Sequence, residues 1–242
     1  MTKNKLHRNQ FQNYFRDEEA FEVADIEAFY RQFEPSIKRG TLDWRIHELV
    51  NQTVIYRIGR GKYTLREARE FTAPVSLRLK QLFGQLSNEF PYTKMCIWTT
   101  TWLHDWMLHL PAAHFLLVET EKGAEESLFY FLKEIRKNVF LQPSANLLEK
   151  YARYDKEIII VKTLISQSPL VKKGKIVVPH LEKILVDLVA DEELFQAFQG
   201  RDLLEIYSNS QRLYAVNEGR LLRYAQRRGR RETVLSLLNE TK

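Results

Sequence analysis

A stretch of about forty residues near the amino terminus limits the folds open to this chain more than any other part of it. Apolar residues recur at helical spacing from Asp25 to Phe33, so a helix is predicted there. Glu34-Pro35 ends it, because the residue before a proline avoids the helical conformation. A second amphipathic helix is predicted from about Thr41 to Val50.

A predicted β-hairpin follows these two helices directly. The segments 54–58 and 62–65 are rich in residues that favour strands, and Gly59-Arg60-Gly61 between them permits a tight reversal. The order helix, turn, helix and hairpin predicts a winged helix-turn-helix domain over residues 25–72. Residues 1–24 are polar with scattered aromatics at roughly helical spacing. We expect them to be an extension of the domain, either a helix that docks on the body of the protein, which the spacing favours, or a loose arm.

The charge of this region favours a polyanionic partner. Residues 36–66 hold seven basic and two acidic residues, a net charge of +5. The second helix of such a domain fits the major groove, and a hairpin beside it can reach the backbone, so these cations would meet phosphates. We expect double-stranded DNA as the partner, bound by Lys38, Arg39, Thr41, Arg45, Arg57, Arg60 and Lys62. The alternatives are a winged helix used for protein contact and ordinary solvated surface charge.

A second basic run lies close to the carboxyl terminus. Six arginines occur between residues 220 and 231 with no acidic residue among them: Arg220, Arg223, Arg227, Arg228, Arg230 and Arg231. The whole chain carries a net charge of +6, so the residues outside the two basic stretches sum to −5. The run is either a second surface for nucleic acid or an acidic partner, or a solvated helix face whose arginines pair with acids elsewhere in the chain.

After the predicted winged helix-turn-helix domain, predicted strands and helices alternate over residues 75–242. The apolar runs 114–120 and 158–164 are typical of buried strands in a partly parallel sheet, and the chain is predicted to be helical beyond Leu181. The predicted fold class is therefore α/β, α+β overall: a winged helix-turn-helix followed by a mixed-sheet α/β domain with a helical carboxy-terminal part.

Composition excludes several classes of protein. The single cysteine, Cys96, rules out an internal disulfide and a cysteine metal cluster, and it lies in an apolar run typical of a core strand. The amino terminus has no apolar signal region and no run spans a bilayer, so we expect a cytoplasmic protein without membrane contact.

No catalytic or metal-binding pattern is evident. His104, His109 and His114 are five residues apart, which does not place two on one helix face, so no metal site and no cofactor are predicted. Lys183 and Asp187 are expected to form a surface ion pair one helical turn apart. We expect a protein that is not an enzyme; the alternative is a nuclease or nucleotidyltransferase-like enzyme of defence systems whose winged helix presents the nucleic acid.

Two segments together resemble a known family. Residues 41–50 and 55–63 resemble the amino-terminal winged helix of AbiEi-like abortive-infection antitoxins. Residues 179–188 and 222–229 are similar to the carboxy-terminal domain of an uncharacterised bacterial relative of that family.

The resemblance implies a transcriptional autoregulator that binds repeats in its own promoter. It also implies an antitoxin role in a type IV toxin–antitoxin system of phage defence, where the functional partner is a nucleotidyltransferase toxin. The glycine-serine and aspartate signature of such a toxin is absent from this chain, which favours the antitoxin side.

Overall fold

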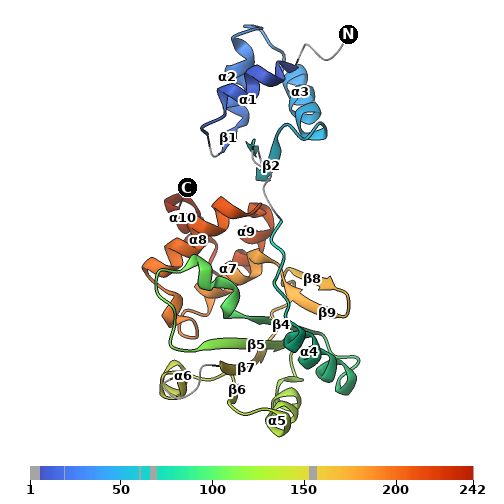
Figure 1. The fold of residues 1–242 in the computed structure, drawn as a ribbon, viewed down its shortest axis with the longest axis vertical. Helices are drawn as coiled ribbons and strands as arrows, with labels where there is room; N and C mark the ends of the chain where they lie inside the picture. Colours follow the sequence, from blue (N-terminus) through green and yellow to red (C-terminus); the bar gives the residue numbers. More distant parts are fainter. Residues whose placement is uncertain (1–5, 19, 60, 66–69, 153–156, 242) are drawn as a thin grey trace. The chain divides into compact units, whose positions relative to one another are not determined.

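The computed structural model describes residues 6–18, 20–59, 61–65, 70–152 and 157–241. The chain divides into two compact units: unit 1 comprises Met1–Glu70 with Gln211–Gly219, and unit 2 comprises Phe71–Ser210 with Arg220–Lys242. Helices, several β-sheets and a helical carboxy-terminal part are all present, so the predicted mixed α/β class is confirmed (Figure 1).

Unit 1 holds three helices and a three-stranded antiparallel sheet. In chain order the elements are α1 (Arg8–Tyr14), β1 (Phe21–Glu22), α2 (Val23–Arg31), α3 (Arg39–Asn51), β2 (Tyr56–Gly59) and β3 (Lys62–Thr64). The strand order is β1-β3-β2. Helix α2 begins two residues before the predicted start, because Glu22 and Asp25 form a capping box in which Asp25 Oδ2 accepts from the Glu22 N–H at 2.7 Å.

The segment before residue 25 belongs to the core of unit 1. Phe11, Phe15 and Phe21 are buried, and they pack with Ile26 and Phe29 in one hydrophobic cluster. Phe15 stacks on Phe21 with ring centroids 4.1 Å apart, and β1 pairs with β3. The helix that the aromatic spacing favours is present as α1, and from residue 6 onward this segment supplies part of the apolar interior of unit 1.

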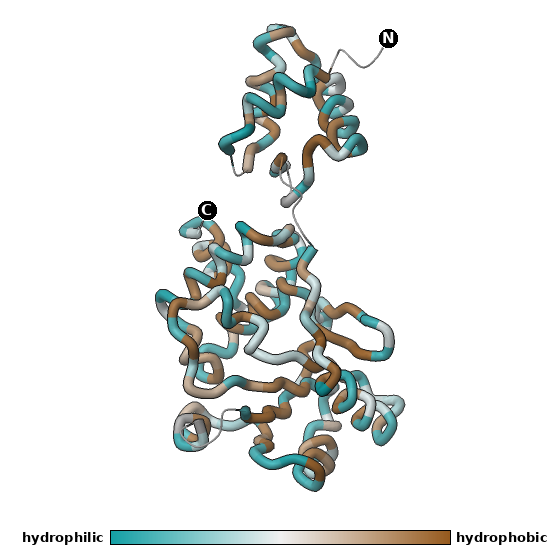
Figure 2. Tube along the Cα trace, viewed as in Figure 1, coloured by the Kyte–Doolittle hydropathy of each residue, from teal (hydrophilic) through white to brown (hydrophobic). Residues whose placement is uncertain are grey.

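Unit 2 is built on a four-stranded mixed sheet in the order β4-β5-β7-β6. Its strands are β4 (Met95–Thr99), β5 (His114–Thr120), β6 (Val139–Leu141) and β7 (Glu157–Thr163). Strand β5 pairs antiparallel with β4 and parallel with β7, and six of its seven residues are buried. The prediction of a buried, partly parallel sheet is therefore confirmed, and the apolar character of these strands is visible in Figure 2.

Helices cover both faces of this sheet. They are α4 (Leu77–Glu89), the 3-10 helix η2 (Thr100–Trp106), α5 (Glu125–Ile135), α6 (Ala145–Ala152), α7 (Leu181–Ala190), η3 (Gln196–Phe198), α8 (Arg201–Leu213), α9 (Glu218–Arg227) and α10 (Arg231–Glu240). Helices α5 and α6 lie on one side of the sheet and α7 to α9 lie on the other (Figure 1). Every residue from Leu181 to Val189 of α7 is buried, so this helix is the centre of the unit.

A short hairpin completes unit 2. Strand β8 (Leu170–Lys173) was not predicted, because its adjacent residues Lys172 and Lys173 suggest a charged turn; it pairs antiparallel with β9 (Ile176–Pro179). Gly174, with a φ of 62°, makes the tight turn between them. Within the residues that the structure describes, no helix is long and apolar enough to cross a bilayer.

The packing of α1 predicts a large loss of stability for Phe11→Ala. The side chain is fully buried among four aromatic rings, so its removal leaves a cavity, which typically costs about 3–5 kcal/mol of unfolding free energy. Chemical denaturation followed by circular dichroism measures this loss. Tyr14→Ala is the matched control, since Tyr14 is half exposed on the same helix. Equal effects of the two substitutions would show that α1 is not part of the core.

Candidate functional site

Helix α3 and the hairpin of unit 1 present one set of exposed polar side chains. The exposed residues at and along α3 are Lys38, Arg39, Asp43, Trp44, His47 and Asn51. Arg39 Nε lies 3.2 Å from Asp43 Oδ1, and Asn51 Nδ2 lies 3.0 Å from His47 Nδ1. Arg57 on β2 is also exposed. This exposed set therefore contains positively and negatively charged side chains, hydrogen-bond donors and acceptors, and the aromatic ring of Trp44.

Arg45 does not belong to that face, so its predicted role in base contact is wrong. Its side chain is only 6% exposed, and its Nη2 donates to Glu34 Oε2 at 2.7 Å. The guanidinium also lies over the ring of Tyr30, 4.6 Å from the centroid. The cause is helical geometry: Arg45 lies three residues after Leu42 and four before Leu49, both buried, so it shares their inward face.

The other predicted DNA-binding residues have varied surroundings. Thr41 is half-buried on the first turn of α3. Lys62 is half-buried, and its Nζ lies 3.7 Å from Glu22 Oε1. Arg60 falls outside the described residues. The structure thus leaves Lys38, Arg39 and Arg57 as the exposed cations of the predicted set.

Unit 2 contains a charged cluster at its centre, around Lys183 of α7. Lys183 is completely buried, and its Nζ donates to Glu119 Oε1 at 2.6 Å and to Asp187 Oδ2 at 2.5 Å. Glu119 comes from β5 and also accepts from Trp98 Nε1 of β4 at 2.7 Å. The predicted Lys183–Asp187 pair exists, but it lies in the interior and not on the surface.

A second layer of contacts connects this cluster to α9 and balances its charge. Asp187 Oδ1 accepts from Tyr224 Oη at 2.9 Å and from Arg228 Nη1 at 2.6 Å. Arg228 Nη2 donates to Asp191 Oδ1 at 2.7 Å, and Lys162 of β7 donates to the other oxygen of Asp191. Lys162, Lys183 and Arg228 together match the three carboxylates of Glu119, Asp187 and Asp191, so the network is neutral.

The neighbouring carboxylates determine the protonation of the cluster. Burial acts to lower the pKa of Lys183, but Asp187 and Glu119 outweigh it and hold that pKa well above its usual value. Burial acts to raise the pKa of Asp187, but Lys183, Lys162 and Arg228 outweigh it and lower that pKa. Both groups are therefore charged at neutral pH, as in a fully paired buried network.

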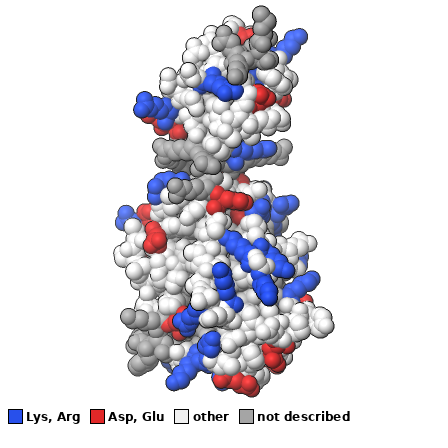
Figure 3. All heavy atoms as spheres, turned by 45° about the vertical axis from the view of Figure 1, so that its right-hand side comes forward, with Lys and Arg blue, Asp and Glu red and all other residues white. Residues whose placement is uncertain are grey.

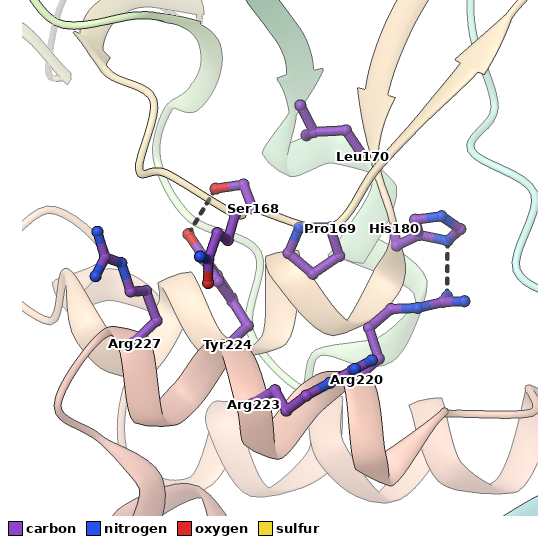
Figure 4. A pocket seen from close by; sticks show the side chains of 9 residues that line it. Ser168, Pro169, Leu170, His180, Arg220, Arg223, Tyr224 and Arg227 are labelled. Carbon is purple, nitrogen blue, oxygen red and sulfur yellow. Dashed lines mark hydrogen bonds between the residues drawn. The ribbon is translucent and has the colours of Figure 1, made fainter.

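A pocket of about 430 Å³ lies between α9 and the segment that leads into β8. Its lining comprises Gln167, Ser168, Pro169, Leu170, His180, Arg220, Arg223, Tyr224 and Arg227 (Figure 4). The three arginines occupy positions i, i+3 and i+7 of α9 and so share one face, while Leu221, Tyr224 and Ala225 are buried against the unit. Among the residues that the structure describes, no carboxylate belongs to the lining of this pocket.

Hydrogen bonds fix the walls of the pocket. Arg220 Nη1 donates to His180 Nδ1 at 3.0 Å and lies 3.3 Å from Glu182 Oε2 (Figure 4). Arg227 donates to the hydroxyl of Ser166. Ser168 Oγ lies 3.1 Å from Tyr224 Oη, which in turn donates to Asp187. The floor of the pocket is therefore held by the buried network.

The predicted second basic surface is divided by the fold. Arg220, Arg223 and Arg227 line the pocket, whereas Arg228 points inward to Asp187 and Asp191. Gly229, with a φ of 66°, ends α9 in a Schellman motif in which the N–H of Arg230 donates to Ala225 O at 2.9 Å. Arg230 is exposed there, and Arg231 pairs with Glu232 at 2.8 Å.

Sequence reasoning missed the buried network and the polar lining of the pocket. A signal for the network existed, because Glu119 interrupts an otherwise apolar strand, which is typical of a buried charge with a partner.

The three histidines of unit 2 that sequence reasoning judged unable to bind a metal have other surroundings. His109 pairs with Asp202, and His114 pairs with Glu157. Burial lowers the pKa of His104, and the neighbouring His114 lowers it further. Among the described residues, no three His, Cys, Asp or Glu side chains are placed to hold a metal ion.

Replacing Lys183 by methionine is predicted to destabilise unit 2 strongly. Removing one partner of a buried ion pair leaves an uncompensated charge, which costs about 3–5 kcal/mol. Lys183 is the largest of the influences that lower the pKa of Asp187, so without its ammonium that pKa rises, and a carboxylate that takes up a proton regains part of this stability as the pH falls. Urea denaturation at pH 7.5 and 5.5 should therefore show a smaller difference from wild type at the lower pH.

In the wild-type chain, acidification should lower the free energy of unfolding instead of restoring it. The lowered pKa of Asp187 contributes stability that is complete above the pKa of an unfolded aspartate, about 3.9, and is lost below it, so little change is expected between pH 7.5 and 5.5. Lys80→Met, at an exposed position of α4, is the control. A pH-independent loss in Lys183→Met would contradict the role of Lys183 in lowering the pKa of Asp187.

Comparison with known proteins gives one match. A search of curated protein sequences found none that matches this chain. A family model described as "Family of unknown function (DUF6577)" matches residues 41–242, which include helix α3 from its third residue onward, the hairpin of unit 1 and all of unit 2. Since this match covers most of the sequence, the chain belongs to the DUF6577 family.

Proposed function

We propose that this protein is a DNA-binding transcriptional regulator without enzymatic activity, which binds duplex DNA through unit 1. The observation that carries the proposal is the element order of that unit. Three helices and three strands alternate as α1-β1-α2-α3-β2-β3, with β1 added to the β2–β3 hairpin. This order supports the proposal that unit 1 is a winged helix-turn-helix, in which α3 would enter the major groove.

The exposed side of α3 has the chemistry needed to read bases. Arg39 lies at the start of the helix, where recognition helices contact base edges, and arginine pairs with guanine through two hydrogen bonds. His47 and Asn51 follow on the same helix and are also exposed. Lys38 and Arg57 would contact phosphates, which position the protein without reading sequence.

Two substitutions separate phosphate contact from base reading. Arg57→Gln should weaken binding to all duplexes about equally and reduce the slope of log affinity against log salt by about one. Arg39→Ala should instead relax sequence preference at one position by about 1–3 kcal/mol. Fluorescence anisotropy with a duplex from the region upstream of the protein's own gene, compared with a shuffled duplex, measures both.

The control is an arginine of the same unit that lies outside this face. Arg31 of α2 is exposed and pairs with Glu27 of its own helix at 2.6 Å, so Arg31→Gln should leave DNA affinity unchanged. Wild-type binding that is absent, or that does not depend on Arg57, would overturn the proposed use of this face.

The antitoxin part of the proposal rests on the resemblance of residues 41–50 and 55–63 to AbiEi-like antitoxins, and of residues 179–188 and 222–229 to an uncharacterised relative of that family. We infer that the chain opposes a nucleotidyltransferase toxin and represses its own promoter. Co-expression with a nucleotidyltransferase encoded beside its gene should restore growth that the toxin alone arrests. Continued growth arrest in the presence of folded protein would contradict this role.

No specific observation favours the alternative that the protein is an enzyme. The two carboxylates considered for it are engaged in ion pairs, since Asp187 is buried in an ion network and Glu182 lies beside Arg220.

A further inference from the structure

The arginine pocket of unit 2 has the composition of an anion-binding site. Three guanidinium groups, from Arg220, Arg223 and Arg227, border one cavity that no carboxylate lines. Basic side chains also gather on one face of the larger unit, with few acidic ones between them (Figure 3). An arrangement of this kind repels cations and concentrates anions.

The pocket is organised before any ligand binds. His180 and Glu182 hold Arg220, and Ser166 holds Arg227, so the orientations of two guanidinium groups are already set. Since arginine has no acceptor, His180 Nδ1 must accept the bond from Arg220, which leaves Nε2 as the donor of that ring. Preformed walls lower the entropy that is lost on binding.

The lining matches a phosphate group joined to an organic part. A planar guanidinium can donate two parallel hydrogen bonds to phosphate oxygens, and three guanidinium groups line this pocket. His180 is the N-cap of α7, so the positive end of that helix dipole also lies at the pocket. Pro169 and Leu170 supply an apolar wall. A volume of about 430 Å³ is in the range of small-molecule sites.

We propose that this pocket binds a phosphorylated small molecule. Arg223 and Arg227 hold its phosphate, while Pro169 and Leu170 contact its organic part. A small ligand fits better than the backbone of a nucleic acid, because the arginines lie within two turns of one helix and border a single cavity, whereas a nucleic acid strand needs a row of cations along a groove.

Calorimetric titration of the full chain tests this proposal with two probes, inorganic pyrophosphate and adenosine monophosphate, at constant ionic strength. Both should bind wild type, and adenosine should not. In the Arg223→Gln/Arg227→Gln double variant the affinity should fall by about tenfold or more for each guanidinium removed. Both residues are exposed, so the double variant should keep the wild-type melting temperature.

Arg230→Gln is the matched control, because Arg230 belongs to the same basic run but does not line the pocket. Its affinity for both probes should equal that of wild type. A single-stranded oligonucleotide is the third arm. Binding of the oligonucleotide through Arg223 and Arg227 without binding of either small probe would overturn the proposal, as would equal affinities of wild type and double variant. Arg57→Gln should leave probe binding intact, which separates this result from the test of DNA binding.

Discussion

The buried ammonium group of Lys183 is the interaction on which unit 2 depends. A lysine without solvent contact is tolerated only beside carboxylates, and Glu119 and Asp187 provide them at 2.6 and 2.5 Å. Glu119 is in the central strand of the sheet and Lys183 in the helix that covers it, so the ion pair fixes one register of α7 against β5. A shift of α7 by a single residue would leave charges unpaired in the core.

The same network determines what reaches the surface. Asp187 holds Tyr224 and Arg228, and these contacts fix α9 along α7. With α9 held in this way, its other arginines point away from the interior and line the pocket: Arg220, Arg223 and Arg227. The network thus holds three cations and three carboxylates of this unit inside, and the arginines of α9 that it does not use line the pocket. Unit 1 also divides its arginines, because Glu34 and the ring of Tyr30 hold Arg45 inside while Arg39 and Arg57 are exposed.

Much of the fold could be predicted from periodicity alone. The strand His114–Thr120 lies at its predicted residues, and the helical carboxy-terminal part begins at Leu181 as predicted, since long apolar runs and regular spacing leave few alternatives. The break at Gly229 was also predictable, because glycine is the usual residue for a left-handed helix end. The strand at Leu170–Lys173 was not, because half of its residues are lysines.

The sites were harder to predict, because charge in a sequence does not say which way a side chain points. Arg45 and Arg228 are as basic as their neighbours, yet both are turned inward by partners far away in the sequence, Glu34 for Arg45 and Asp191 for Arg228. Lys183 and Asp187 have the spacing of an ordinary surface pair, and only Glu119, sixty-four residues earlier, shows that they are buried. Such pairings depend on tertiary contacts that periodicity does not contain.

Hydroxyl-radical footprinting of the protein, with and without its upstream duplex, tests the central claim most directly. If DNA binds to the exposed face of α3, oxidation of Trp44, which is 44% exposed, should fall on complex formation. Tyr92 of unit 2, which is 96% exposed, should react equally in both states and serves as the internal reference. Unchanged oxidation of Trp44 in a saturated complex would contradict the account.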